Sequence, residues 1–264
     1  MLVASADPTS EREDSGMQRL LSKTMNFYRR NGLSLTLRRA ASILSRDHKY
    51  TFSEIYRSNI WGDAESKSGA GSTELATREI RAHLPIIFSQ WKLSNIIDAP
   101  CGDYNWFKLI LLDQNMSYIG IDIVPDLIAE NKRKYADPHH RFLLADITTD
   151  SLPTGDILMC RDCLIHLSNK DIFKFLRNFI ASGTPFLLTS TYKNEANFSN
   201  EDILTGEVRS IDLFSPPFSL PSDVVYRFVD FIPPSPPREM CLWNRDQIIK
   251  ALAGNRAAKT MAAS

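Results

Sequence analysis

The stretch Asp98-Ala-Pro-Cys-Gly-Asp-Tyr-Asn105 follows directly on the short apolar run Asn95-Ile-Ile97 and decides the fold class. The apolar run is typical of a buried strand, and Gly102 lets the loop backbone approach a ligand closely. In an open α/β sheet, ligands bind beyond the carboxyl ends of the strands. We therefore expect a ligand site here, with a helix that begins near Asp103 and points free N–H groups at an anionic group.

Strands and helices alternate around this stretch. Strands are predicted at 95–99, 117–122, 141–145, 156–160 and 185–191, and helices at 106–114, 126–135 and 169–180. Such alternation predicts a Rossmann-like, doubly wound α/β sheet that is mostly parallel. After residue 191 the alternation stops, and proline-rich turns separate strands expected at 208–214, 224–232 and 239–243. These strands predict an antiparallel edge.

The chain divides into four segments. Residues 1–16 are predicted to be a disordered tail, 17–92 to hold N-terminal helices and a substrate or cofactor loop, 93–252 to form the α/β domain, and 253–264 to fray. Either Met1 or Met17 could start the protein. Helices are expected at 17–45, interrupted at Gly32, and at 73–90, kinked or split by Pro85.

Composition excludes several classes of protein. The formal net charge is zero, so no nucleic-acid partner is expected. No apolar run reaches the roughly 18 residues of a membrane span, the first residues lack a signal-peptide core, and four scattered cysteines do not make a disulfide framework. A cytoplasmic protein is expected. The basic residues of 17–49 form either a solvated helix face or a peripheral contact with an anionic membrane or amphiphilic substrate.

Three acidic residues end three successive predicted strands: Asp98, Asp122 and Asp146. Each alone could cap a helix or form a turn, but parallel strand ends share one edge, so together they predict one acidic rim. Asp122 lies ~24 positions after Asp98, near the spacing of an acid that binds a ribose diol. A dinucleotide is excluded, because the loop has one glycine and Asp103 would repel a pyrophosphate.

In this order the motifs resemble those of class I S-adenosylmethionine-dependent methyltransferases. Asp98-x-x-x-Gly102 is similar to the first motif, with Pro100 and Tyr104 in place of usual glycines, and Ser117-Tyr-Ile-Gly-Ile-Asp122 is similar to the ribose strand. Ala145-Asp146-Ile147 resembles the adenine loop, and 161–167 the segment after the fourth strand. The resemblance implies S-adenosyl-L-methionine as cofactor. The residues it assigns to cofactor binding are Asp98, Ala99, Pro100, Gly102, Trp106, Asp122, Ile123, Asp146, Ile147 and Arg161.

A narrower resemblance concerns Trp61-Gly-x-x-Glu65-Ser-x-Ser-Gly-x-Gly-Ser72 together with 98–106. Both are similar to a bacterial branch that includes the rhizobial nodulation enzyme 2-O-methylating fucose on lipochitooligosaccharide Nod factors. It implies a glycan or glycolipid acceptor and a substrate loop with Trp61, Glu65, Ser68, Gly69 and Ser72. A small metabolite, a lipid or a protein side chain remain alternative acceptors, and a non-catalytic cofactor-binding protein is a further alternative.

Transfer to a sugar hydroxyl benefits from a general base, because the hydroxyl is a poor nucleophile. His166 and Asp162, after the fourth strand, are the candidates, and a histidine with an ordinary pKa near 6.5 suits the role. His166 could instead pack against the following helix. Arg161 could bind the cofactor carboxylate or pair with an acid of the rim. Cys160 and Cys163 have too few neighbouring ligands for zinc, and no metal is expected.

Overall fold

The computed structural model describes residues 47–192 and 198–255, together with Met25, Leu33, Thr36, Leu37, Ala40, Ala41, Ser42 and Ser45. The tail expected at 1–16 lies outside the described residues, as do the residues after 255. Of the helix expected at 17–45, the description covers only those separate positions.

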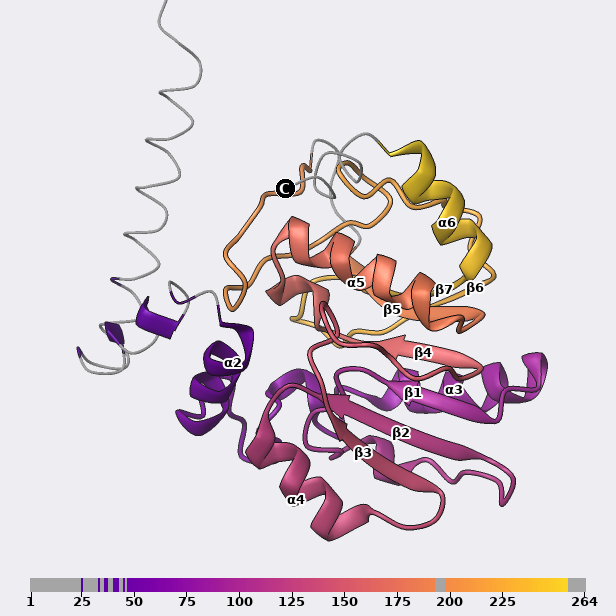
Figure 1. The fold of residues 1–264 in the computed structure, drawn as a ribbon, viewed down its shortest axis with the longest axis horizontal. Helices are drawn as coiled ribbons and strands as arrows, with labels where there is room; N and C mark the ends of the chain where they lie inside the picture. Colours follow the sequence, from indigo (N-terminus) through magenta and orange to yellow (C-terminus); the bar gives the residue numbers. More distant parts are fainter. Residues whose placement is uncertain are drawn as a thin grey trace, which may run out of the picture.

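Seven strands form one sheet in the order β3-β2-β1-β4-β5-β7-β6 (Figure 1). The strands are β1 (Asn95–Asp98), β2 (Ser117–Asp122), β3 (His140–Leu144), β4 (Ile157–Cys160), β5 (Phe186–Tyr192), β6 (Tyr226–Val229) and β7 (Arg238–Asn244). The first five strands pair in parallel, and β7 runs antiparallel to both β5 and β6. The Rossmann-like, mostly parallel sheet with an antiparallel edge is confirmed.

Helices cover both faces of the sheet. Successive residues of a strand point to opposite faces, so neighbouring apolar residues pack against helices on opposite sides. Ile96 and Tyr118 pack in one core cluster with α3 (Arg78–Trp91) and α4 (Pro125–Tyr135). Their neighbours Ile97 and Ile119 pack in a second cluster with α5 (Asn169–Ser182) and α6 (Arg245–Gly254). Each such fully buried aliphatic side chain stabilises the fold by roughly 1.5–3 kcal/mol. Central strands buried on both sides therefore need the continuous apolar runs seen in the sequence.

Helix α3 differs from the helix expected at 73–90. It begins at Arg78 and runs through Pro85 without a split. The preceding residues form turns, in which the Thr73 hydroxyl accepts from the Ala76 backbone N–H and the Thr77 hydroxyl donates to the Thr73 carbonyl. Threonine side chains that bond the local backbone in this way compete with helix formation.

The prediction of a helix at 106–114 was wrong. Only a single 3₁₀ turn forms, η2 (Phe107–Leu109), and the residues after it are irregular. This one turn already buries Trp106, Phe107 and Ile110, whereas Leu111 is 96% exposed. A longer helix would therefore have no further apolar face to bury.

Two expectations after residue 191 need correction. No strand forms at 208–214; instead this loop runs along β5, where Tyr192 N–H donates to the Ile211 carbonyl and Leu213 N–H to the Thr191 hydroxyl. Because the loop packs along β5, its residues are alternately more and less buried, which is the pattern that predicted a strand.

Helix α6 was not expected, although Asn244 and Gln247 form a capping box at its start. It continues past Leu252, where the frayed tail was expected to begin, and ends at Gly254.

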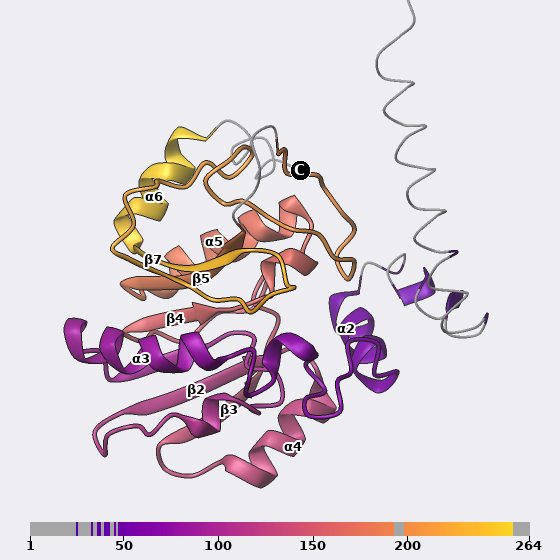
Figure 2. The same cartoon turned by 180° about the vertical axis from the view of Figure 1, so that it is seen from behind.

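Helix α2 (His48–Arg57) lies beyond the carboxyl ends of β1, β2 and β4, away from the body of the sheet in both views (Figures 1 and 2). It starts at Asp47, whose carboxylate accepts from the Tyr50 backbone N–H. The loop from 58 to 69 leads from α2 to a short 3₁₀ turn, η1 (Ala70–Ser72). In the parts of the chain that the structure describes, no helix combines the length and apolarity that crossing a membrane needs.

Candidate functional site

A cavity of about 440 Å³ lies at the carboxyl ends of the strands and is covered by α2 and the loop that follows it. Almost all of the residues singled out from the sequence line this cavity. They are Trp61, Ser68, Gly69, Ser72, Asp98, Pro100, Gly102, Trp106, Asp122, Ile123, Asp146, Ile147, Arg161, Asp162 and His166. The topology thus brings motifs from more than a hundred positions of the chain to one place.

Two singled-out residues do not line the cavity. Ala99 is fully buried in the core cluster below it, and its backbone N–H donates to the Met159 carbonyl. Glu65 is exposed, and its carboxylate accepts from the Asn105 amide at 2.6 Å and from the Glu74 backbone N–H. Glu65 therefore connects two loops beside the cavity, whereas Ala99 belongs to the core.

The loop after β1 has no helix N-terminus behind it, contrary to the expectation for Asp103. Instead, Asp103 faces the loop that follows α2. Its carboxylate accepts from the hydroxyls of Ser66 and Ser68 and from the Lys67 backbone N–H, and its own N–H donates to the Ser68 hydroxyl at 2.9 Å. The two stretches that carried the narrower resemblance are therefore in direct contact.

Gly102 sits where these two loops come closest. Its φ is +54°, in the left-handed region that favours glycine. A Cβ at this position would lie 2.4 Å from the Ser68 hydroxyl oxygen. The position therefore requires glycine for both its backbone conformation and its close contact.

Asp98 and Asp122 are buried carboxyl groups at the base of the cavity. The Tyr118 hydroxyl donates to Asp98 at 2.7 Å, yet burial raises the pKa of Asp98 to about 8. Asp122 accepts from the backbone N–H groups of Gly102 and Val124, and burial raises its pKa to about 6. Burying a carboxylate is costly, so two of them facing one cavity is an arrangement typical of a functional site.

Asp146, the third acid of the predicted rim, is held from two sides. One oxygen accepts from the backbone N–H and hydroxyl of Thr148, at 2.8 and 2.7 Å. The other oxygen lies 3.1 Å from His48 Nδ1. His48 belongs to α2 and was not singled out from the sequence, since a lone histidine next to a helix start carries no motif.

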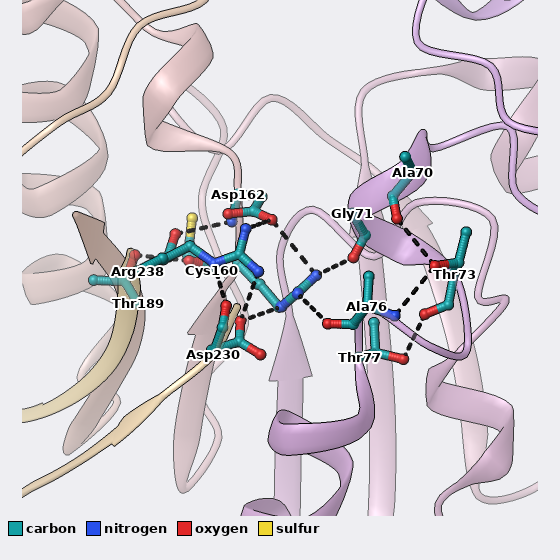
Figure 3. Close-up of polar contacts among 12 residues, drawn as sticks. Ala70, Gly71, Thr73, Ala76, Thr77, Cys160, Asp162, Thr189, Asp230 and Arg238 are labelled. Atoms are coloured by element: carbon teal, nitrogen blue, oxygen red, sulfur yellow. Dashed lines mark hydrogen bonds and ion pairs between the residues drawn. The ribbon is translucent and has the colours of Figure 1, made fainter. Parts of the chain in front are cut away.

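A buried charge network borders the cavity at the end of β4. Figure 3 shows Arg238 between Asp162 and Asp230, and the Arg238 guanidinium donates to both carboxylates. Arg161 donates to Asp230 at 2.8 Å and to the carbonyls of Gly71 and Ala76. The partner of Arg161 is thus Asp230, which is not one of the acids of the predicted rim, and the assignment of Arg161 to cofactor binding stays a prediction. Arg161 and Arg238 are each less than a tenth exposed, and Asp230 is fully buried.

Asp162 is fixed by this network at the cavity wall. Its φ is +52°, its backbone N–H donates to the Ser190 hydroxyl, and the Gly71 backbone passes close to its carboxylate. Asp230 and Arg238 were missed from the sequence because they come from the proline-rich part near β6 and β7, about 70 residues from their partners.

His166 lies against Trp61 in the cavity wall. The two rings stack with centroids 4.3 Å apart and planes inclined by 29°. His166 Nδ1 is 2.9 Å from the Glu207 carbonyl oxygen. A carbonyl only accepts, so Nδ1 carries the hydrogen, and in the neutral ring Nε2 then holds the basic lone pair.

Two cysteines, Cys101 and Cys163, are among the residues that line the cavity. None of the four cysteines forms a disulfide, and all four are buried. Over residues 47–192 and 198–255, no three His, Cys, Asp or Glu side chains are grouped so that they could hold a metal ion.

Comparison with known proteins identifies the fold. No protein-family model matches the chain, and no curated protein sequence does. Solved structures do match. A SAM-dependent methyltransferase from Leishmania major is 18% identical with a TM-score of 0.55, and the match covers 75% of this chain and 85% of that one.

Two bacterial enzymes match to a similar degree. The 1,6-didemethyltoxoflavin-N1-methyltransferase of Burkholderia thailandensis, with bound S-adenosylhomocysteine, is 16% identical with a TM-score of 0.55, covering 78% of this chain and 88% of that one. The N-methyltransferase NodS of Bradyrhizobium japonicum, in complex with S-adenosylhomocysteine, is 15% identical with a TM-score of 0.54, covering 72% and 97%. The chain therefore has the Rossmann-like fold of S-adenosylmethionine-dependent methyltransferases.

Proposed function

We propose that this chain is an S-adenosylmethionine-dependent O-methyltransferase whose acceptor is a glycan hydroxyl, the 2-hydroxyl of fucose on a lipochitooligosaccharide Nod factor. The observation that carries the proposal is the convergence of Asp98, Asp122 and Asp146 on one cavity at the carboxyl ends of β1 to β3. The methyltransferase fold and the resemblance of 61–72 and 98–106 to the rhizobial fucose 2-O-methyltransferase branch support it.

The residues of the cavity fit the cofactor in size and chemistry. Asp122 would accept hydrogen bonds from the ribose hydroxyls, and Asp146 with Ile123 and Ile147 would enclose the adenine. Gly102 lets the backbone approach the amino-acid end, near the buried carboxyl of Asp98. When bound, S-adenosylmethionine supplies a methyl group on a positively charged sulfur. The carboxylates of Asp122 and Asp146, which are charged at neutral pH, suit that charge, whereas they would repel a pyrophosphate.

His166 would act as the general base. Its Nε2 would take up the proton of the acceptor hydroxyl, and the imidazole ring would then carry the positive charge that the cofactor's sulfur loses when its bond to the methyl group breaks. The Glu207 carbonyl and the Trp61 ring hold the imidazole in one orientation. Asp162, held by Arg238, is the alternative base or binds acceptor hydroxyls. Positioning supplies much of the remaining rate, since methyl transfer is an in-line displacement.

The acceptor end of the cavity has features that suit a sugar. Trp61 and Tyr192 provide aromatic surface, and Asp162 and Ser235 provide polar groups beside it. Aromatic faces with adjacent hydrogen-bonding groups are a common way to bind a ring that has one apolar and one polar side. The basic residues of 17–49 would serve as a docking surface for the acylated substrate or for an anionic membrane.

Cofactor binding is the first test. Titration calorimetry with S-adenosylhomocysteine should show binding to the wild-type protein, and Asp122→Ala should weaken it at least tenfold. Asp126→Ala is the matched control, because Asp126 is an exposed acid on α4 that pairs with Arg57. Absence of binding at millimolar ligand would refute the proposal.

The acceptor is tested separately. Incubation with a fucosylated Nod factor and the cofactor should add one methyl group, which mass spectrometry of the released fucose should place on the 2-oxygen. His166→Ala should keep the S-adenosylhomocysteine affinity and slow turnover by about a hundredfold. Methylation of a small metabolite, lipid or protein with no methylation of fucose would keep the enzyme class and overturn the acceptor. Binding of the cofactor with no methyl transfer would support a non-catalytic protein.

A further inference from the structure

His48 joins three separate elements at the edge of the cavity. Its Nδ1 lies 3.1 Å from an oxygen of Asp146, which follows β3, and its Nε2 lies 3.2 Å from an oxygen of Asp171, in the first turn of α5. The His48 and Asp146 side chains are less than a fifth exposed, and that of Asp171 less than a tenth. One ring therefore links α2 both to Asp146, after the end of β3, and to the start of α5.

The geometry requires the charged form of this ring. Both ring nitrogens face carboxylate oxygens, which accept hydrogen bonds, so both nitrogens carry hydrogens only in the imidazolium. The hydrogen bonds to Asp146 and Asp171 raise the pKa of His48 to about 9, against the opposing effect of burial. Asp47 caps the same helix, Asp150 accepts from the Asp146 backbone N–H, and Lys174 pairs with Asp171.

The two carboxylates are themselves immobilised, so the ring has fixed partners. The second oxygen of Asp146 is bonded to Thr148. Asp171 accepts from the hydroxyls of Ser168 and Thr205 and from Lys174. Burial raises the pKa of Asp171, but the hydrogen bonds from His48 and these neighbours lower it below its ordinary value.

The contact between His48 and Asp146 is also part of a wall. His48, Ile123, Ala145 and Asp146 line both the 440 Å³ cavity and an adjoining hollow of about 520 Å³. Loss of the contact would let the two spaces join next to the residues assigned to adenine. The ion-paired ring of His48 is therefore one of the side chains that separate the two spaces.

The other polar contacts of α2 are weaker anchors. Arg57 pairs with Asp126 at 2.9 Å, but both side chains are more than half exposed. Exposed ion pairs of this kind contribute ~0–1 kcal/mol. The Tyr56 hydroxyl donates to Glu130 at a long 3.3 Å. Among the described contacts, His48 makes the most buried charged link between α2 and the sheet.

We infer that His48 is a positioning residue of the cofactor site, which orients the Asp146 carboxylate and anchors α2 as the roof of the cavity, so that retention of the cofactor depends on it. This rests on the proposed function, because it takes the cavity to bind S-adenosylmethionine. His48 acts through Asp146 and α2, and it need not touch the cofactor.

The test measures binding of S-adenosylhomocysteine alone. Surface plasmon resonance at pH 7.5 should show at least tenfold weaker binding for His48→Gln, mainly through faster dissociation. Arg57→Gln, which removes the exposed anchor of the same helix, should stay within twofold of wild type. His48→Ala with thermal unfolding provides a second variant, and circular dichroism checks that each protein is folded.

Two further readouts separate positioning from a general structural effect. Wild-type affinity should fall as pH rises through about 9, and the ratio of wild-type to His48→Gln affinity should shrink toward one by pH 10. Asp171→Asn should weaken binding in the wild type and have little further effect in His48→Gln, which a double-mutant cycle detects.

The outcomes distinguish the inference from the proposed function. A wild-type protein that does not bind S-adenosylhomocysteine overturns both. Equal binding by wild type and His48→Gln overturns the role of His48 and leaves the proposed function standing. Equal losses in Arg57→Gln and His48→Gln also overturn it, because any loosening of α2 would then have the same effect.

Discussion

Removing Arg238 should destabilise the protein strongly, since its side chain is buried among charged partners. It donates to the carboxylates of Asp162 and Asp230 and to the Asp230 carbonyl. In Arg238→Ala, Asp230 keeps only Arg161, and the nearest remaining cation to Asp162 is Arg161 at 3.6 Å. Removing one partner of a buried ion pair typically costs 3–5 kcal/mol, because the other charge is left unpaired.

The magnitude can be measured by urea unfolding followed by fluorescence, in which the midpoint should fall while the slope stays constant. For a domain of this size each kcal/mol lowers Tm by ~2–4 °C, so a Tm loss of roughly 6–20 °C is expected. Arg78→Ala is the matched control, because the Arg78 side chain is 64% exposed and its ion-pair partner Glu79, the next residue in α3, is also accessible to solvent. It should cost less than ~1 kcal/mol. A loss below that value in Arg238→Ala would refute the reasoning.

The same variant should show a characteristic dependence on pH. Burial already raises the pKa of Asp230 above its ordinary value, and loss of Arg238 raises it further. A carboxyl group whose folded pKa exceeds the unfolded value binds more protons when folded, so stability falls as pH rises through this range. Arg238→Ala should therefore lose more stability relative to wild type at pH 8 than at pH 5. A constant difference would mean that the pKa of Asp230 does not depend on Arg238.

Three other predictions concern the loops and α2. The pKa of His48 is about 9 in the folded protein against 6.5 when unfolded, so the stability that protonated His48 gives the fold should be complete below pH 6.5 and lost as pH rises through 9. After discounting for partial exposure, this contribution amounts to ~1 kcal/mol. It can be measured by comparing the unfolding free energies of wild type and His48→Gln at pH 6 and at pH 10. Gly102→Ala should lower stability by ~1–2 kcal/mol in thermal unfolding, because of its positive φ and the contact with Ser68. Asp103→Ala should release the loop beside it, so that limited proteolysis at Lys67 becomes faster while cleavage elsewhere does not change; an unchanged rate would show that Asp103 does not hold the loop.

The strands of the sheet were predictable because their signal is local. A continuous apolar run marks a strand buried on both sides, and β2 matches its predicted bounds at both ends. The errors come from segments whose apolar residues are buried by other means. The loop at 208–214 alternates because it packs along β5, and Trp106, Phe107 and Ile110 are buried by a single turn. Periodicity reports which residues are buried, and it does not report which hydrogen bonds the backbone makes.

The candidate site was predictable only where it follows the strands. Asp98, Asp122 and Asp146 could be grouped because parallel strands place their carboxyl ends at one edge. His48 and Arg238 could not, since each reaches the cavity from an element whose position depends on tertiary packing. Their partners lie 98 and 76 residues away in sequence. Single charged residues at such separations carry no pattern.

The contact between the two loops explains how the first loop keeps its shape with so few glycines. Tyr104 replaces a usual glycine, yet it keeps a positive φ of 58°, at some cost in backbone strain. Its ring is buried against Tyr118 and Phe142, which offsets that cost. On the other side, Asp103 is held by hydrogen bonds from the loop at 66–68. Aromatic packing and a neighbouring loop thus replace glycine flexibility, and each loop of the sequence pair needs the other for its conformation.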